Sequence, residues 1–251
     1  MISKDAIVKL AKINNVRAWQ QEKHYLQAVM LATLAEYPLV FKGGTYLWFF
    51  HELPRFSEDL DFTSQGTIPE NLAEDVSDSL SLFGIQNKIK ILKKDRFINS
   101  FKFACEGPLH TTEKDVSHVY VEISSRDEVK HETQSHTFEH AGYNLPVKII
   151  QGMALVEVAA EKVRAIFTRD KARDLYDLAY LIAEKNTPFD RELVNSKLDF
   201  YNQTYKYSLF EAKIAEKKQY WSGELQQLLA RSLTPFGEVK NSVLDWAEKT
   251  K

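Results

Sequence analysis

The sequence has a single cysteine, Cys105, among its 251 residues, so no disulfide can form within the chain. So few cysteines are typical of proteins in a reducing compartment. No apolar run approaches the ~20 residues that a membrane-spanning helix needs. The first residues also lack the apolar core of a signal peptide. These absences lead us to expect a cytoplasmic protein with no membrane partner.

The chain also lacks a strong charge of either sign and several common catalytic signatures. Its 33 Lys and Arg residues nearly balance its 35 Asp and Glu residues, for a formal net charge of -2. A nucleic-acid partner would therefore need a local basic patch. Neither the phosphate-binding P-loop, the Rossmann glycine pattern nor the nucleophile elbow of serine hydrolases occurs.

Hydrophobic periodicity changes near residue 150. Before this point, stretches with the period of amphipathic helices alternate with stretches that have the period of two typical of strands. After it, every recognisable period is helical. We therefore predict an α+β protein with a mixed α/β domain over residues 1–150 and a helical domain over residues 151–251. The predicted helices are 3–13, 20–36, 46–53, 69–83, 153–168, 172–184, 190–200, 208–218, 222–232 and 236–248; the predicted strands are 39–41, 59–62, 85–94, 96–105, 118–125 and 147–150, and residues 126–146 are predicted to be irregular.

Residues 41–62 hold the most informative pattern. Gly43 and Gly44, with Thr45 directly after them, follow a short apolar strand and precede an apolar helix. A glycine turn that opens a helix leaves backbone N–H groups available for a phosphate. Asp59 and Asp61 alternate with apolar residues, so on a strand both carboxylates point the same way. Because paired carboxylates suit Mg²⁺, the stretch indicates phosphoryl or nucleotidyl transfer.

Three more residues are candidates for the same site. Glu122 lies on the polar face of the predicted strand 118–125, and a third carboxylate there could complete a two-metal site. Arg55, just before the aspartates, could pair with a phosphate or with a neighbouring carboxylate. Ser57 lies in the same short segment, so we assign it to nucleotide binding as well.

The predicted hairpin over residues 86–102 is rich in cations. A basic ribbon of this kind could contact an RNA backbone. Equally, it could be a solvated sheet face or a pair of lysine-protected edge strands, and the sequence leaves both interpretations open. The cations are Lys88, Lys90, Lys93, Lys94, Arg96 and Lys102.

A second group of charged residues falls on two predicted helices of the C-terminal domain. Lys162 is polar between apolar neighbours. Asp174 and Asp177 are three residues apart and share a helix face, and Arg173 precedes Asp177 by four residues. Either salt bridges tie the two helices together, or Lys162 reaches a triphosphate as a point charge.

Both groups of residues resemble the AbiEii/AbiGii toxin family, a branch of the DNA polymerase beta-like nucleotidyltransferases. The first match is the stretch 41–62, with its Gly-Gly-Thr turn and Asp-Leu-Asp. The second comprises Glu161-Lys162-x-Arg164-Ala165 and Arg173-Asp174-x-x-Asp177-Leu178. The order of motifs covers roughly residues 20–185. The resemblance implies a nucleotidyltransferase-like mixed β-sheet flanked by helices, with a helical C-terminal part that completes the active site.

The resemblance also implies an activity. It is the Mg²⁺- or Mn²⁺-dependent transfer of a nucleoside monophosphate from a nucleoside triphosphate to an RNA acceptor, with the 3′ end of tRNA expected. The protein would be the toxin of a toxin–antitoxin or abortive-infection module that defends against phage, with a cognate antitoxin as partner. By position, the resemblance implies that Gly44 and Thr45 hold the triphosphate, that Asp59 and Asp61 are metal ligands, that Lys162 contacts the nucleotide, and that Asp174 or Asp177 lies near the site. Glu122 is matched only by its place on a strand, and we add it as a third metal ligand. We therefore expect Asp59, Asp61, Glu122 and Lys162 to be catalytic, and we expect the nucleotide to meet Gly43, Gly44, Thr45, Arg55, Ser57, Lys162, Arg173, Asp174 and Asp177.

Two other functions remain open at this point. The same enzyme could modify a protein or a small molecule instead of RNA. Alternatively, the chain could bind nucleotides without turning them over. The two aspartates argue against the second possibility, because a silent protein needs neither. If the acceptor is RNA, the basic hairpin 86–102 is the segment that we expect to bind it.

Overall fold

The computed structural model describes residues 1–229 and 232–248, and these residues form two compact units. The sheet unit comprises Met1–Phe50, Phe56–Glu128 and Thr133–Gly152. The helical unit comprises His51–Arg55, Val129–Glu132 and Met153–Lys251. The chain is thus divided near residue 152, with two short earlier segments that belong to the helical unit.

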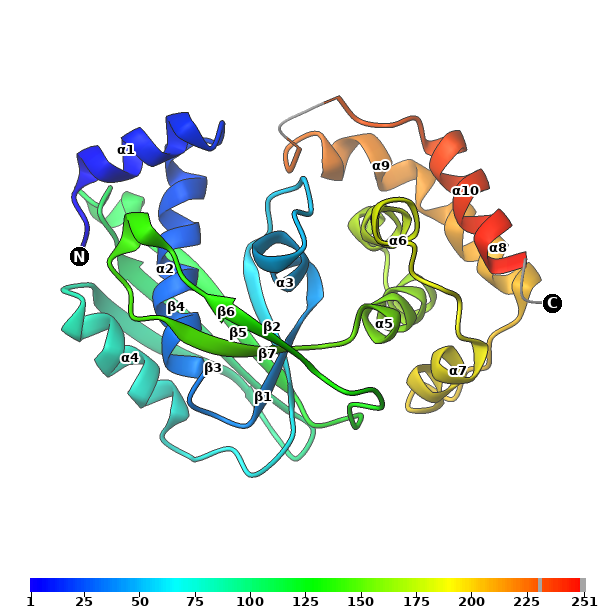
Figure 1. Ribbon diagram of the computed structural model, residues 1–251, viewed down its shortest axis with the longest axis horizontal. Helices are drawn as coiled ribbons and strands as arrows, with labels where there is room; N and C mark the ends of the chain where they lie inside the picture. The colour runs from blue at the N-terminus through cyan, green and yellow to red at the C-terminus, as the bar shows by residue number, and fades with distance from the viewer. Residues whose placement is uncertain (230–231, 249–251) are drawn as a thin grey trace. The chain divides into compact units, whose positions relative to one another are not determined.

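The sheet unit is built on seven strands in the order β3-β4-β5-β2-β1-β7-β6 (Figure 1). β2 runs parallel to β5 and β1 parallel to β7, whereas the other neighbours are antiparallel. The sheet is therefore mixed, and the predicted α+β class is confirmed. The strands are β1 (Leu39–Lys42), β2 (Asp59–Ser64), β3 (Gln86–Lys94), β4 (Ile98–Glu106), β5 (Ser117–Ser124), β6 (Gln134–Phe138) and β7 (Lys148–Gly152).

Four helices belong to the sheet unit. α2 packs on β5 and α4 on β3, and the two helices also contact each other, so they cover one face of the sheet. Alternate residues of the strands, such as Phe103 and Val119, are fully buried there. The covered face is the core because strand side chains alternate between the two faces. The helices are α1 (Lys4–Ile13), α2 (Ala18–Leu34), α3 (Gly43–Phe50) and α4 (Leu72–Leu82).

The predicted strands and helices of this unit are found, with two corrections. The segment 126–146, predicted to be irregular, contains β6. This strand lies at the edge of the sheet, where it pairs with β7, and it is mostly exposed, so it needs no apolar alternation to form. In addition, α3 begins at Gly43 rather than near Tyr46, so the glycine turn is itself the first turn of the helix.

The helical unit contains six helices among the residues described. α5 packs against α6, α7 and α8, and α6 packs against α9 and α10. Predicted helices at 153–168 and 172–184 are confirmed by α5 and α6. The helix predicted over 222–232 corresponds to α9, which begins and ends earlier in the chain. Residues 230–231 lie outside the described part of the chain. The helices are α5 (Leu155–Thr168), α6 (Ala172–Lys185), α7 (Arg191–Asp199), α8 (Tyr207–Glu216), α9 (Lys218–Leu225) and α10 (Phe236–Glu248).

Specific hydrogen bonds explain why the two short segments join the helical unit. The hydroxyl of Tyr180 donates to the carbonyl oxygen of His51 at 2.5 Å. The buried carboxylate of Glu157 accepts from the backbone N–H groups of Lys130 and His131 at 3.0 and 3.1 Å. Glu157 also pairs with Lys197 at 2.6 Å. Across the described helices of both units, none is long and apolar enough to cross a membrane.

Candidate active site

Asp59 and Asp61 lie where the alternation of β2 predicts. Leu60 and Phe62 point into the core, with 0% and 2% of their surface exposed, and the aspartates occupy the opposite face. Asp61 is the register partner of Glu122 on the parallel neighbour β5. The three carboxylates line one pocket of about 250 Å³, so the structure brings all three predicted metal ligands to the same place.

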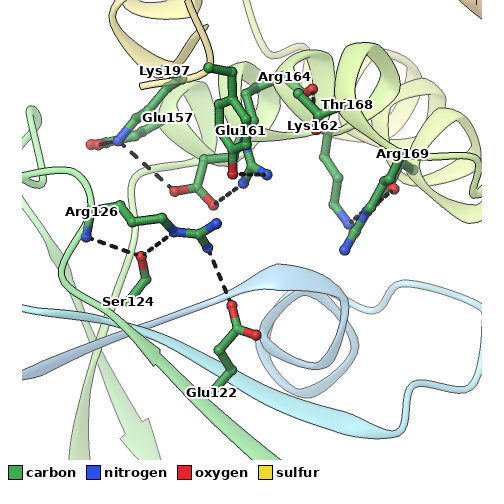
Figure 2. Close-up of polar contacts among 12 residues, drawn as sticks. Glu122, Ser124, Arg126, Glu157, Glu161, Lys162, Arg164, Thr168, Arg169 and Lys197 are labelled. Carbon is green, nitrogen blue, oxygen red and sulfur yellow. Dashed lines mark hydrogen bonds and ion pairs between the residues drawn. The ribbon is translucent and has the colours of Figure 1, made fainter. Parts of the chain in front are cut away.

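Glu122 has a cationic partner on its own side of the pocket. An Nη of Arg126 lies 3.3 Å from its Oε1 (Figure 2). Arg126 also donates its Nε to the hydroxyl of Ser124 at 3.0 Å, which fixes the guanidinium. Among the described residues, no group of three or more His, Cys, Asp or Glu side chains is arranged to hold a metal ion. The metal role of Glu122 therefore stays a prediction, and in this arrangement its carboxylate is paired with Arg126.

The glycine turn lies directly against these carboxylates. Gly43 has a φ of +76°, a conformation that L side chains rarely adopt, and it opens α3 immediately after β1. A Cβ built at this position would lie 2.5 Å from Oδ2 of Asp61. The first N–H groups of a helix have no partner within the helix. The N-terminus of α3 can therefore offer N–H donors to an anion next to the carboxylates.

Thr45 lies at the first turn of α3 and contacts the start of β2. Its side chain is fully buried, and its hydroxyl donates to the backbone oxygen of Asp59 at 2.5 Å. The same hydroxyl is hydrogen-bonded to the hydroxyl of Ser57 at 2.9 Å. Gln27 in turn donates to the backbone oxygen of Ser57 at 3.2 Å. In this structure Thr45 thus holds the start of β2 in place, and its contact with a triphosphate stays a prediction.

A second polar cluster lies within the helical unit. Lys162 on α5 lies 3.1 Å from Asp174 and 2.5 Å from Asp177, both on α6. Arg55 donates Nε and Nη2 to the two oxygens of Asp177 at 2.5 and 2.6 Å. Arg169 donates to both oxygens of Asp174 at 2.7 and 2.8 Å. These five side chains comprise three cations and two carboxylates.

Burial alone would raise the pKa of a carboxyl, and both Asp174 and Asp177 are completely buried. The neighbouring cations outweigh that effect. Lys162 and Arg169 hold the pKa of Asp174 well below its usual range, and Arg55 with Lys162 lowers the pKa of Asp177. Both carboxylates therefore stay charged, which a buried site tolerates only because each has two cationic partners.

The partners in this cluster differ from those that sequence spacing indicates. Arg173 precedes Asp177 by one helical turn, yet its Nε lies 3.8 Å from Glu224 on α9. Asp177 pairs instead with Arg55, which is buried and lies 122 residues earlier in the chain. Arg169 was not predicted at all. Its position just beyond the end of α5 was the available signal, because a cation there is five residues from Asp174.

The two clusters belong to different units of the chain. The pocket with Asp59, Asp61 and Glu122 lies in the sheet unit. The cluster around Lys162 lies in the helical unit. That Lys162, Asp174 and Asp177 meet the same nucleotide as the aspartates remains a prediction.

A mixed sheet here presents two aspartates on one strand, beside a glycine turn that opens a helix, and this arrangement suits an enzyme that acts on phosphates. Residues 24–246 match the model of the family described as "Nucleotidyl transferase AbiEii toxin, Type IV TA system". The chain belongs to this family, and it is a nucleotidyltransferase of a type IV toxin–antitoxin system.

Solved structures show the same fold. JHP933 from Helicobacter pylori is 23% identical with a TM-score of 0.63, and the match covers 92% of this chain and 90% of that one. MenT4, a nucleotidyltransferase toxin from Mycobacterium tuberculosis H37Rv, is 18% identical with a TM-score of 0.67, over 98% and 88% of the two chains. A search of the curated proteins found no match.

Proposed function

We propose that this toxin transfers a nucleoside monophosphate from a nucleoside triphosphate to an RNA acceptor in the cytoplasm, with the 3′ end of tRNA as the expected acceptor. A cognate antitoxin would restrain it. The observation that carries the proposal is the contact between Gly43 and Asp61. It brings N–H donors for phosphates and carboxylates for a cation together at one point of the sheet unit.

The donor set fits Mg²⁺ or Mn²⁺. Mg²⁺ is commonly held by one or two carboxylates together with substrate phosphates and water, and Asp59 and Asp61 supply the two carboxylates. A bound divalent cation would neutralise charge that develops on the phosphates during transfer. No third protein ligand is needed for this role, so Glu122 can stay paired with Arg126.

The side chains of the protein would then bind and orient the substrates. The first turn of α3, beginning at Gly43 and Gly44, donates N–H groups to the triphosphate. Lys162 adds a positive charge from a cluster in which cations outnumber carboxylates. The acceptor hydroxyl attacks the α-phosphorus, the bond to the bridging oxygen breaks, and pyrophosphate leaves. A carboxylate of the pocket accepts the proton of the hydroxyl.

Label transfer tests the proposal. Purified protein is incubated with each α-labelled nucleoside triphosphate, Mg²⁺ and, in turn, tRNA, total RNA, total protein and small-molecule acceptors. We expect label on RNA with the unaltered chain, and a loss of at least ~100-fold with Asp61→Asn, as is typical when a group that stabilises the transition state is removed. Asp245→Asn, at an exposed position of α10, is the matched control.

The outcomes separate the competing functions. Label on protein or on a small molecule would replace the RNA acceptor. Metal-dependent nucleotide binding without any transfer would indicate a silent nucleotide-binding protein. Full activity in Asp61→Asn, with unchanged thermal unfolding, would remove the assigned site. Glu122→Gln should lose less activity than Asp61→Asn if Glu122 is not a metal ligand.

A further inference from the structure

A row of side chains crosses the sheet from the aspartates to the basic hairpin. Register pairs Asp59 with Tyr120 on β5, Tyr120 with Lys102 on β4, and Lys102 with Lys90 on β3. Residues paired in register lie on the same face, and neighbouring strands are about 4.8 Å apart. The row therefore extends from the carboxylate pocket for roughly three strand spacings, or about 14 Å.

This row lies on the open face of the sheet. The adjacent row, with Leu60, Val121 and Phe101, is buried in the core, with 0%, 1% and 5% exposed surface. Tyr120, in contrast, is 37% exposed and lines the pocket together with Asp59 and Asp61. An aromatic ring of this size on an open strand face, within a polar pocket, has no core to fill.

Lys102 is held beside that ring. Its Nζ lies 5.8 Å from the centroid of Tyr120, within the range of a cation–π contact. The cation thus lies beside the aromatic ring of Tyr120. An aromatic ring flanked by cations is the arrangement by which proteins bind single-stranded nucleic acid, with bases stacked on the ring and phosphates near the cations.

The structure also divides the cations of the hairpin. Lys88, Lys90 and Lys102 share the open face with Tyr120. Lys93 pairs with Asp95 at 3.2 Å, and the guanidinium of Arg96 lies over the ring of Phe97. The prediction that the whole hairpin 86–102 binds the acceptor is therefore narrowed to one face of it.

The strand order shows on which side of the aspartates the row and the expected triphosphate site each lie. β2, with the aspartates, lies between β1, which leads into Gly43, and β5, which carries Tyr120. The triphosphate site and the row are thus on opposite sides of the carboxylates. In phosphoryl transfer the attacking and leaving oxygens are roughly in line, on opposite sides of the phosphorus. With pyrophosphate on the Gly43 side, the attacking hydroxyl must come from the side of Tyr120.

We propose that Tyr120 is the platform on which the 3′-terminal base of the acceptor RNA stacks, and that Lys102 and Lys90 contact the phosphates that precede it. This inference rests on the proposed transfer to RNA. It makes Tyr120 a binding residue for the acceptor and not for the nucleoside triphosphate. Stacking tolerates any base, so the platform positions the end of the strand without reading its sequence.

Steady-state kinetics of three variants test the platform. Tyr120→Leu removes the ring, Tyr120→Phe restores it, and Tyr220→Leu is the matched control because Tyr220 is also 37% exposed but lies on α9. For Tyr120→Leu we expect the KM for RNA to rise about tenfold, the scale of one stacked base. The KM for the nucleoside triphosphate should stay unchanged. Tyr120→Phe should bring the RNA KM back towards that of the unaltered chain.

An RNA with an altered end makes the test specific. Binding of a fluorescein-labelled single-stranded RNA is measured without nucleotide, using one oligomer with a normal 3′ nucleotide and one with an abasic 3′ residue. The abasic end should weaken binding to the unaltered chain about tenfold and leave binding to Tyr120→Leu unchanged. The two losses should not add, because both remove the same contact.

Salt dependence tests the cations of the row. Replacing Lys102 or Lys90 by Gln should each reduce the slope of log affinity against log salt by about 0.7, the single-strand value for one phosphate contact. Lys114→Gln, at an exposed position outside the sheet, is the control and should leave the slope unchanged. Slopes that are equal in all three variants would overturn the assignment of the lysines.

The results distinguish failure of this inference from failure of the proposed function. If the unaltered chain labels RNA but Tyr120→Leu has the same RNA KM, the platform is wrong and RNA transfer stands. If only the KM for the nucleoside triphosphate rises, Tyr120 contacts the nucleotide, which also overturns the inference. If the unaltered chain labels protein and binds neither RNA oligomer, both proposals fall together.

Discussion

Gly43 and Asp61 are in such close contact that no side chain fits between them. The Cβ of any other residue at position 43 would lie 2.5 Å from Oδ2 of Asp61 and 3.1 Å from its Cβ. The backbones of Asp61 and Gly43 cannot easily move apart, because Asp61 is part of β2 and Gly43 joins β1 to α3. The glycine therefore serves the site in two ways, since it permits the left-handed backbone and leaves room for the carboxylate.

We expect Gly43→Ala to abolish nucleotide transfer. The methyl group displaces Asp61, and the backbone conformation costs a further 1–2 kcal/mol or so. Gly84→Ala is the control, because Gly84 has a φ of +77° but its nearest neighbours to an added Cβ are 3.7 Å away. Both variants should lower the melting temperature, and only Gly43→Ala should lose transfer. Equal activity in the two would show that room beside Asp61 is unimportant.

The hydroxyl of Thr45 should matter for both stability and rate. Thr45→Val leaves the backbone oxygen of Asp59 without its buried donor, at a cost of about 1–3 kcal/mol in unfolding free energy. Because the start of β2 loosens, we also expect a lower turnover number, and Thr45→Ser should retain most of it. Urea unfolding and label transfer measure the two effects.

Thr33→Val supplies the comparison. The hydroxyl of Thr33 also makes a short hydrogen bond, to Ser79 at 2.6 Å, but it lies on α2 outside the pocket. It should lower stability with no change in turnover. If Thr45→Val behaves in the same way, Thr45 is a structural residue without influence on Asp59.

Loss of Asp177 should be among the most costly single changes in the helical unit. Asp177→Ala leaves Arg55 and Lys162 buried without this partner, which typically costs 3–5 kcal/mol, or about that, in unfolding free energy. Asp177→Asn keeps the shape and should cost less, so it remains measurable if the alanine variant does not fold. Denaturant titration followed by circular dichroism measures both.

A surface ion pair is the comparison for the loss of unfolding free energy in Asp177→Ala. Glu216 pairs with Lys213 at 2.9 Å on α8, with 44% of its side chain exposed. Glu216→Ala should cost less than about 1 kcal/mol because water screens the pair. A loss for Asp177→Ala as small as this one would contradict a buried, tightly coupled cluster.

Acid should destabilise the helical unit through the same two carboxylates. Their pKa values are lowered by folding, so below about pH 4 the unfolded chain binds protons that folded Asp174 and Asp177 do not. Their contribution to stability is therefore complete above the unfolded pKa and is lost as pH falls through the folded value. Unfolding free energy measured from pH 7 to pH 3 should decline most steeply at the acid end.

Lys162→Met tests the cause of that decline. Without Lys162 the pKa of each aspartate rises towards its usual value, so stability should depend less steeply on pH below about 4. Lys114→Met, at an exposed position, should keep the original slope. An unchanged slope in Lys162→Met would mean that other carboxylates cause the acid sensitivity.

Local sequence was sufficient for most elements of the fold. Ser3 and Asp5 are both candidate caps for the start of α1, and it is the hydroxyl of Ser3 that accepts from the N–H of Ala6. Gly84 predicts the end of α4, and its positive φ confirms this role. β6 was not predicted because most of its residues are polar. As an edge strand it is stabilised by hydrogen bonds to β7, and its sequence has no apolar alternation that would reveal it.

The candidate site was predictable only in its two short motifs. Gly43 and Asp61 each lie in a pattern that has a local physical meaning, the turn and the alternating strand. The partners of Thr45, Glu122 and Arg55 were not predictable. Their hydrogen bonds and ion pairs depend on which elements meet, and sequence spacing alone favoured other partners.

What the sequence by itself determined is that Asp59 and Asp61 share one face of a strand, beside a turn that only glycine permits. Those features follow from backbone geometry within a few residues. The tertiary structure decided the neighbours of that pair. It brought Tyr120 and Lys102 into register with Asp59, and it joined Arg55 to Asp177 across 122 residues. Strand order and helix packing are set by burial of the whole core, so no short segment of sequence encodes them.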